Sequence, residues 1–192
     1  MLCISKGEFM KTIVVYSSQY GATEQYARWL AEALDADLYA VRAISADVLG
    51  GYDCILYGGG LYAGGVKGLP TFLKHFSKCE GKPLILFTCG IADPKDPANV
   101  EQIRSQLHKA LPANIAAQCT FFHLRGRLDY PHLTVVHRAM MAMLRKMLLK
   151  KAPSSLREED RQLLETYGKD VNFIDRSEIE PIVSFEIGRA HV

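Results

Sequence analysis

The sequence lacks the features that mark several large classes of protein. Its apolar runs fall far short of the roughly 20 residues that a membrane-spanning helix needs, and its first residues have no apolar stretch typical of a secretory signal. The five cysteines are scattered, with no CxxC pair. This pattern disfavours a disulfide framework or a structural zinc site, and it favours the reduced thiols of a cytosolic protein.

Charge and metal-ligand patterns are equally sparse. The formal net charge is only +2, too small to indicate nucleic-acid binding. The six histidines show no HxxxH or HExxH spacing, and no Gly-Lys-Ser/Thr phosphate loop is present. We therefore expect neither a metal site nor a nucleoside triphosphate site.

Strand-like and helix-like segments alternate along most of the 192 residues. Such alternation with short links predicts a doubly wound α/β sheet that binds ligands at the carboxyl ends of its strands. We expect a single domain over 11–187, with 1–9 and 188–192 as an extension or a cloning remnant. The expected strands are 12–16, 37–42, 53–57, 83–88 and 118–124, and the expected helices are 22–34, 69–76, 97–111, 132–151 and 156–167.

The loop after the first expected strand carries the sharpest chemical signal. Ser17, Ser18, Gly21 and Thr23 stand between a buried strand and a helix start. Hydroxyls and free backbone N–H groups at a helix N-terminus bind phosphate. The loop has no lysine, so helix dipoles alone would neutralise a phosphate monoester there. An ordinary helix cap uses the same residue types and stays an alternative.

Two more loops of small residues follow the third and fourth expected strands. The segment Gly58–Gly65 allows close backbone approach, and Tyr62 offers a ring for stacking. A dinucleotide fingerprint is matched formally there, but no helix begins at Gly60 and no acid follows the next strand. A flexible glycine loop remains an alternative. In the segment Thr88–Asp93, Cys89 is either a redox thiol or, as we favour, a small buried thiol beside a ligand.

With these three loops in order, residues 11 to about 125 resemble the flavodoxin-like FMN-binding family. The resemblance implies strand order 2-1-3-4-5, counting the five expected strands, and a cytosolic FMN oxidoreductase. It leaves the catalytic residues unknown. The residues implied to bind FMN are Ser17, Ser18, Gln19, Tyr20, Gly21, Ala22, Thr23, Gly59, Gly60, Leu61, Tyr62, Ala63, Gly64, Thr88, Cys89 and Gly90.

The segment after the fifth strand is similar to that of the oxygen-independent protoporphyrinogen oxidase group. The similarity implies an inserted helical segment and FMN-mediated electron flow from a porphyrinogen, a planar anion, toward a quinone. Tyr130 is the expected cover of the flavin, and the arginines expected near it are Arg125, Arg127 and Arg138. A flavodoxin-type carrier for a redox partner protein and a flavin-free interaction module stay open.

The basic helix expected over 132–151 has two interpretations. Its apolar positions suit packing on the sheet, with basic side chains reaching solvent, and we favour this interpretation. Contact with a membrane surface, with cations meeting anionic lipid, is the second.

Overall fold

The computed structural model describes residues 10–62, 65–79 and 81–189. The expectation about residues 1–9 therefore lies outside the described residues, as does that about 190–192. Gly188 and Arg189 continue the last helix, two residues beyond the expected boundary at 187. Within the described residues, no helix has both the length and the apolar character needed to cross a membrane.

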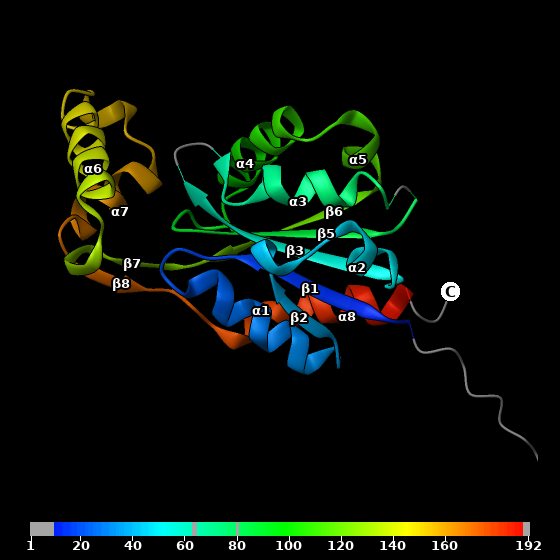
Figure 1. Ribbon diagram of the computed structural model, residues 1–192. Helices are drawn as coiled ribbons and strands as arrows, with labels where there is room; N and C mark the ends of the chain where they lie inside the picture. Colours follow the sequence, from blue (N-terminus) through cyan, green and yellow to red (C-terminus); the bar gives the residue numbers. More distant parts are fainter. Residues whose placement is uncertain (1–9, 63–64, 80, 190–192) are drawn as a thin grey trace, which may run out of the picture.

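Five parallel strands form the central sheet, in the expected order (Figure 1). The order is β2-β1-β3-β5-β6, and the two-residue β4 adds antiparallel to the end of β3. Long apolar runs form these strands because both sheet faces are covered. The bounds are β1 (Thr12–Ser17), β2 (Asp37–Ala40), β3 (Cys54–Tyr62), β4 (Gly65–Val66), β5 (Leu84–Gly90) and β6 (Cys119–Arg125).

Helices cover the two faces of the sheet as separate layers. Strand alternation sends Val14 to one face, where it packs with Leu30 and Ile182 of α1 (Ala22–Ala33) and α8 (Glu180–Arg189). Ile13 and Val15 point to the opposite core, which the other helices cover (Figure 1). Those helices are α2 (Ala46–Gly50), α3 (Leu69–Phe76), α4 (Pro97–Ala110) and α5 (Ala113–Gln118).

The glycine triplet is strand rather than loop. β3 continues through Gly58, Gly59 and Gly60 to Tyr62. A Cβ at Gly58 would overlap the Phe87 ring of β5, and a Cβ at Gly59 would overlap Val66. These glycines therefore let neighbouring side chains pack over the strand. The expected end of this strand at residue 57 is corrected, and the flexible-loop alternative does not hold at these three positions.

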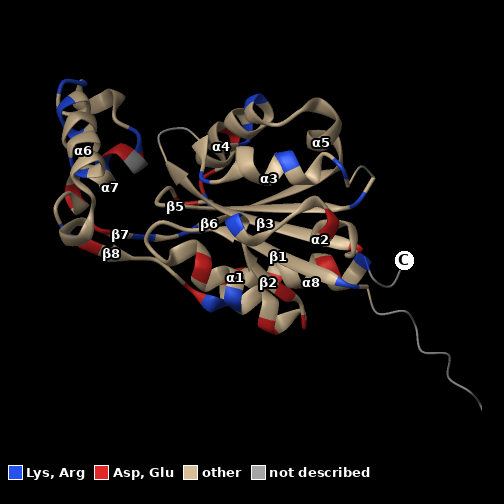
Figure 2. Cartoon of the chain, in the orientation of Figure 1, with Lys and Arg blue, Asp and Glu red and all other residues tan. Residues whose placement is uncertain are grey.

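The expected insertion follows β6 and stands beside the carboxyl ends of the strands (Figure 1). β7 (Arg127–Asp129) pairs antiparallel with β8 (Asp170–Asn172), and between them lie α6 (Val135–Leu148) and α7 (Glu158–Thr166). Lysine and arginine residues occur along α6 (Figure 2). α6 packs against α7 and not on the sheet, contrary to the favoured interpretation. Both faces of the sheet are already covered by other helices, so neither is left for it.

Candidate functional site

A cavity of about 340 Å³ lies at the carboxyl ends of β1, β3 and β5, beneath the inserted segment. All three expected loops reach it, and the insertion closes its far side with Leu133, His137 and Met141 of the α6 region. The residues of the expected set that line it are Ser18, Tyr20, Ala22, Thr23, Gly60, Leu61, Tyr62, Cys89 and Gly90.

The loop from β1 to α1 is built to receive an anion. Gly21 is the N-cap of α1 in a left-handed conformation with φ of 88°, and no side chain in the described part of the chain caps the helix. The N–H groups of the first turn therefore have no partner within the helix. The Ser18 hydroxyl accepts from the Gly21 N–H at 3.1 Å, which holds the turn, and Thr23 is buried against the cavity.

Ser17 and Gln19 face a different hollow. They border a second depression of about 360 Å³, together with Arg42 and Lys67. The Lys67 ammonium donates to the Gln19 side-chain oxygen and lies 5.9 Å from the centre of the Tyr62 ring. The first loop thus does have a cation beside it, and the expectation that helix dipoles act alone is corrected. No sequence signal identified Lys67, because it is far from the loop along the chain.

At the second loop, Gly60 and Tyr62 form the wall of the cavity. A Cβ at Gly60 would lie 2.7 Å from the Tyr62 ring, so any residue other than glycine would force this ring to move. Burial raises the pKa of the Tyr62 hydroxyl to about 12, with Tyr20 and Cys89 adding to the effect. Tyr62 therefore acts as a neutral ring at neutral pH. Gly59 does not line the cavity, and Ala63 and Gly64 lie outside the described residues.

The end of β5 contributes two of its three expected residues to the cavity lining, and Thr88 is not one of them. Cys89 and Gly90 line the cavity. Burial raises the pKa of the Cys89 thiol to about 12, so it is the small buried thiol that we favoured and not a thiolate nucleophile. Thr88 is fully buried, and its hydroxyl lies 2.8 Å from His123 Nδ1. Thr88 therefore supports the core and is not among the residues that line the cavity.

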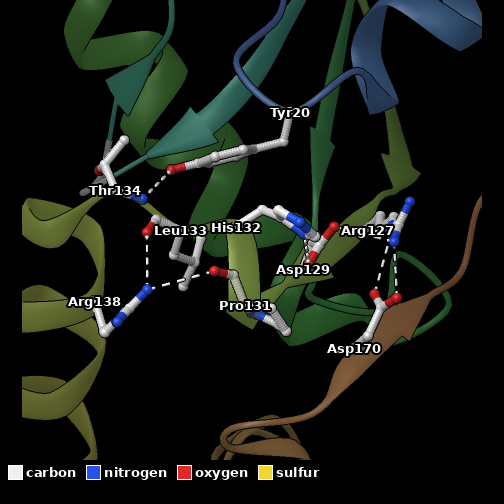
Figure 3. Close-up of polar contacts among 9 residues, drawn as sticks. All are labelled: Tyr20, Arg127, Asp129, Pro131, His132, Leu133, Thr134, Arg138 and Asp170. Atoms are coloured by element: carbon white, nitrogen blue, oxygen red, sulfur yellow. Dashed lines mark hydrogen bonds and ion pairs between the residues drawn. The ribbon is translucent and has the colours of Figure 1, made fainter.

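The inserted segment brings an unexpected histidine into the site. His137 Nδ1 lies 2.5 Å from the Tyr20 hydroxyl, and the imidazole stacks on the Tyr62 ring with centroids 5.3 Å apart and planes at 13°. The Tyr20 hydroxyl also accepts from the Thr134 N–H at 3.3 Å (Figure 3). Two of the expected loops are thus joined to α6. Sequence reasoning gave His137 no place in the site, because nothing local linked it to residues 20 and 62.

Tyr130 does not cover the cavity. It is buried, packs edge-on against Tyr167 with centroids 5.0 Å apart, and is absent from the lining. Proline at position 131 and the 3-10 turn over Tyr130–His132 direct this ring into the inserted lobe. Leu133, His137 and Met140 take the place that we expected Tyr130 to fill.

Only one of the three expected arginines lines the cavity. Arg127 does so while its guanidinium pairs with Asp170 at 2.8 Å and Asp129 at 3.1 Å (Figure 3). Arg125 instead stacks on Phe173, with its guanidinium carbon 3.5 Å from the ring centre. Arg138 donates to the carbonyl oxygens of Pro131 and Leu133, at 3.4 and 3.5 Å (Figure 3).

Gly126 was also missed by sequence reasoning. It lines the cavity, and a Cβ there would lie 2.9 Å from Cys89 Sγ. Its N–H donates to the Gly90 carbonyl at 2.6 Å, and its carbonyl accepts from Phe173 N–H at 3.0 Å. This close backbone approach joins the end of β5 to the insertion. In the described part of the chain, no group of three or more His, Cys, Asp or Glu side chains is placed to hold a metal ion.

Comparisons with solved structures give similar chains of low identity. A putative flavoprotein from Bacteroides eggerthii is 17% identical, with 59% of this chain and 86% of that chain covered and a TM-score of 0.45. A flavoprotein from Lactobacillus acidophilus, solved in complex with FMN, is 16% identical, with coverage of 60% and 92% and a TM-score of 0.43. Flavodoxin 2 from Bacillus cereus is 21% identical, with coverage of 60% and 85% and a TM-score of 0.41.

Comparisons of sequence give a relative and a family. An uncharacterized protein of Methanocaldococcus jannaschii is 36% identical over 83 residues, which are 42% of this chain and 55% of that protein. The chain thus matches about half the length of this curated relative. The family model described as a flavodoxin domain matches residues 13–155, nearly the whole central sheet and much of the insertion. The chain therefore belongs to the flavodoxin domain family.

Proposed function

We propose that this protein binds FMN in the cavity and transfers electrons through the bound flavin. One observation carries the proposal: the cavity joins an uncapped helix N-terminus, which suits a phosphate, to the flat wall formed by Tyr62, which suits a heterocyclic ring. When bound, FMN supplies the redox chemistry, and the protein binds, orients and shields it. The flavodoxin domain match supports the same cofactor.

The residues present fit FMN at both ends of the molecule. The first turn of α1, with Ser18 and Thr23, would hold the phosphate, and Lys67 beside the loop adds a positive charge. Gly60, Gly90 and Gly126 line the cavity, and a Cβ at any of them would lie too close to a neighbouring side chain. Because these residues have no side chain, their backbone would border the flavin ring directly. Tyr62 would lie against the ring system as a neutral aromatic side chain.

We further propose that the electrons come from a planar anionic donor of the porphyrinogen class and pass to a quinone. The inserted segment supports an enzyme over a carrier, because it covers the cavity that a carrier would leave open to its protein partner. The cavity wall there is mostly apolar, with Met140, Met141 and Leu163, and Arg127 also lines it. The cytosolic location expected from the scattered cysteines is part of the same proposal.

Two glycines give a sharp test of FMN binding. Gly21 and Gly81 have φ angles of 88° and 83°, and a Cβ at either would meet no atom of the described residues within 4 Å. Alanine at either position is therefore strained to a similar degree, by roughly 1–2 kcal/mol. We expect Gly21→Ala to weaken FMN binding at least tenfold, because it disturbs the phosphate turn, and Gly81→Ala to leave it unchanged. Quenching of flavin fluorescence on titration measures both affinities.

The outcomes separate the three functions. Folded wild-type protein that shows no flavin absorption bands after incubation with FMN would leave a flavin-free interaction module. Equal FMN affinity for Gly21→Ala and wild type would place the phosphate elsewhere. If FMN-loaded protein oxidises a porphyrinogen with a quinone under anaerobic conditions, the enzyme proposal stands. Electron exchange only with a redox protein, without such turnover, would identify a flavodoxin-type carrier.

A further inference from the structure

The exposed face of α6 is unlike the rest of the described surface. Seven large apolar side chains are markedly exposed in the described part of the chain, and six of them fall within residues 135–149. Four lie on α6 with more than half of their surface exposed: Val135 at 83%, Val136 at 67%, Met143 at 62% and Met147 at 58%. Such a concentration on one helix marks a surface that contacts something apolar.

Helical spacing divides α6 into two apolar faces. His137, Met141, Leu144 and Leu148 recur at intervals of three and four residues and face the cavity and α7, where each is at least partly covered. A second stripe with the same spacing remains exposed; it consists of Val136, Met140, Met143 and Met147. The folded chain thus satisfies the inner face and leaves the outer stripe without a partner among the described residues.

The charge around the outer stripe has a single sign. No acidic residue occurs from Tyr130 to Arg157. Lys146 is three residues from Met143, and Lys150 is three residues from Met147, so on the helix and its final turn each lysine adjoins the stripe. Lys151, by contrast, pairs with Asp160 at 3.0 Å within the lobe.

We propose that α6 docks this protein on the surface of an anionic lipid bilayer. Apolar side chains bordered by lysines are the pattern of a helix that lies in the headgroup region, with the cations meeting lipid phosphates. The 14 residues of α6 extend about 21 Å, shorter than the roughly 30 Å hydrocarbon core, so the helix lies along the surface. A second copy of the chain is a poorer occupant, because it would bring two basic borders together.

Docking in this way places the cavity at the membrane. Met140 belongs both to the outer stripe and to the cavity lining. A bilayer against the stripe would therefore adjoin the cavity rim, and apolar compounds dissolved in lipid would reach the cavity without crossing water. Docking itself needs no flavin, so it goes beyond the proposed function and stands or falls separately from it.

Flotation of the full chain with lipid vesicles tests the proposal. We expect wild type to float with vesicles of phosphatidylcholine containing about one-third phosphatidylglycerol, and much less with phosphatidylcholine alone. Lys146→Gln/Lys150→Gln should weaken binding to the anionic vesicles about thirtyfold, from about fivefold for each cation. Met143→Gln/Met147→Gln should weaken binding more than tenfold by removing the apolar stripe.

A matched control uses two lysines far from the insertion. Lys78→Gln/Lys109→Gln removes the same charge from exposed positions after α3 and on α4, and should leave binding unchanged. Circular dichroism confirms that each variant is folded. Absence of binding by folded wild type, or an equal loss in the control, would overturn the proposal. A wild-type dimer in sedimentation equilibrium that Met143→Gln/Met147→Gln converts to monomer would instead assign the stripe to a second copy and overturn it too.

Discussion

His123 is a half-buried base whose protonation opposes the fold. Its Nδ1 lies 2.8 Å from the Thr88 hydroxyl, and its Nε2 is buried without a hydrogen-bond partner among the described residues. Burial, with a smaller contribution from Arg104, lowers its pKa from 6.5 to about 4. Because the unfolded chain takes up the proton near pH 6.5 and the folded chain does so only near pH 4, stability present above pH 6.5 is lost as the pH falls through this window.

The size of this loss follows from the pKa difference. At about 1.4 kcal/mol for each pH unit, the window corresponds to at most about 3.5 kcal/mol. Part of the ring borders solvent, which screens the charged form, so we expect about 1–2 kcal/mol. The reference is the double variant His123→Phe/Thr88→Val, which replaces both hydrogen-bonding partners by apolar groups of similar shape and has no group to protonate.

Urea unfolding at several pH values measures the effect. Between about pH 7.5 and about pH 4.5, the wild-type midpoint should fall by about 0.5–1 M more than that of the double variant. Comparison of the two proteins cancels the carboxylates that titrate in both. Parallel midpoint curves for the two proteins would refute the reasoning, as would a wild type that gains stability relative to the variant on acidification.

Two further predictions concern contacts within the site. Tyr20→Phe removes the hydroxyl that contacts both His137 and Thr134. Amide hydrogen exchange at the start of α6 should therefore become about fivefold faster, which corresponds to a loss of about 1 kcal/mol. Unchanged exchange would mean that packing alone holds α6 in place. Gly126→Ala should weaken FMN binding about tenfold because its Cβ would lie 2.9 Å from Cys89 Sγ, and adding Cys89→Ala should restore most of it. Failure of the second substitution to restore binding would show that the backbone of Gly126, and not the space beside it, determines affinity.

Elements with a strong pattern were predictable from sequence. The apolar β-branched run at 12–16 became β1, and the helix expected at 69–76 became α3 with the same bounds. The two short helices α2 and α5 were missed, because five or six residues give too little periodicity to recognise. The strand through Gly58–Gly60 was read as loop, because the reason for those glycines is the Phe87 and Val66 side chains packed over them.

Some residues of the candidate site could likewise be predicted from the sequence, and others could not. The three loops were found from residue type, because each follows a strand directly and parallel strands bring their carboxyl ends together. Lys67 and His137 were not found, since they reach the site from turns and helices far along the chain. Tyr130 was misplaced because sequence gives the position of an aromatic residue but not the direction in which a turn sends its ring.

The sequence by itself determined the sheet, the order of its loops and the existence of an inserted basic segment, because these depend on local periodicity and on residue type after each strand. Only the tertiary structure decided where that segment lies. With both sheet faces covered, α6 packs its inner stripe against α7 and the cavity and leaves the other stripe exposed. Two apolar stripes on one helix look alike in sequence, and competition for the available packing surfaces determines which of them is buried.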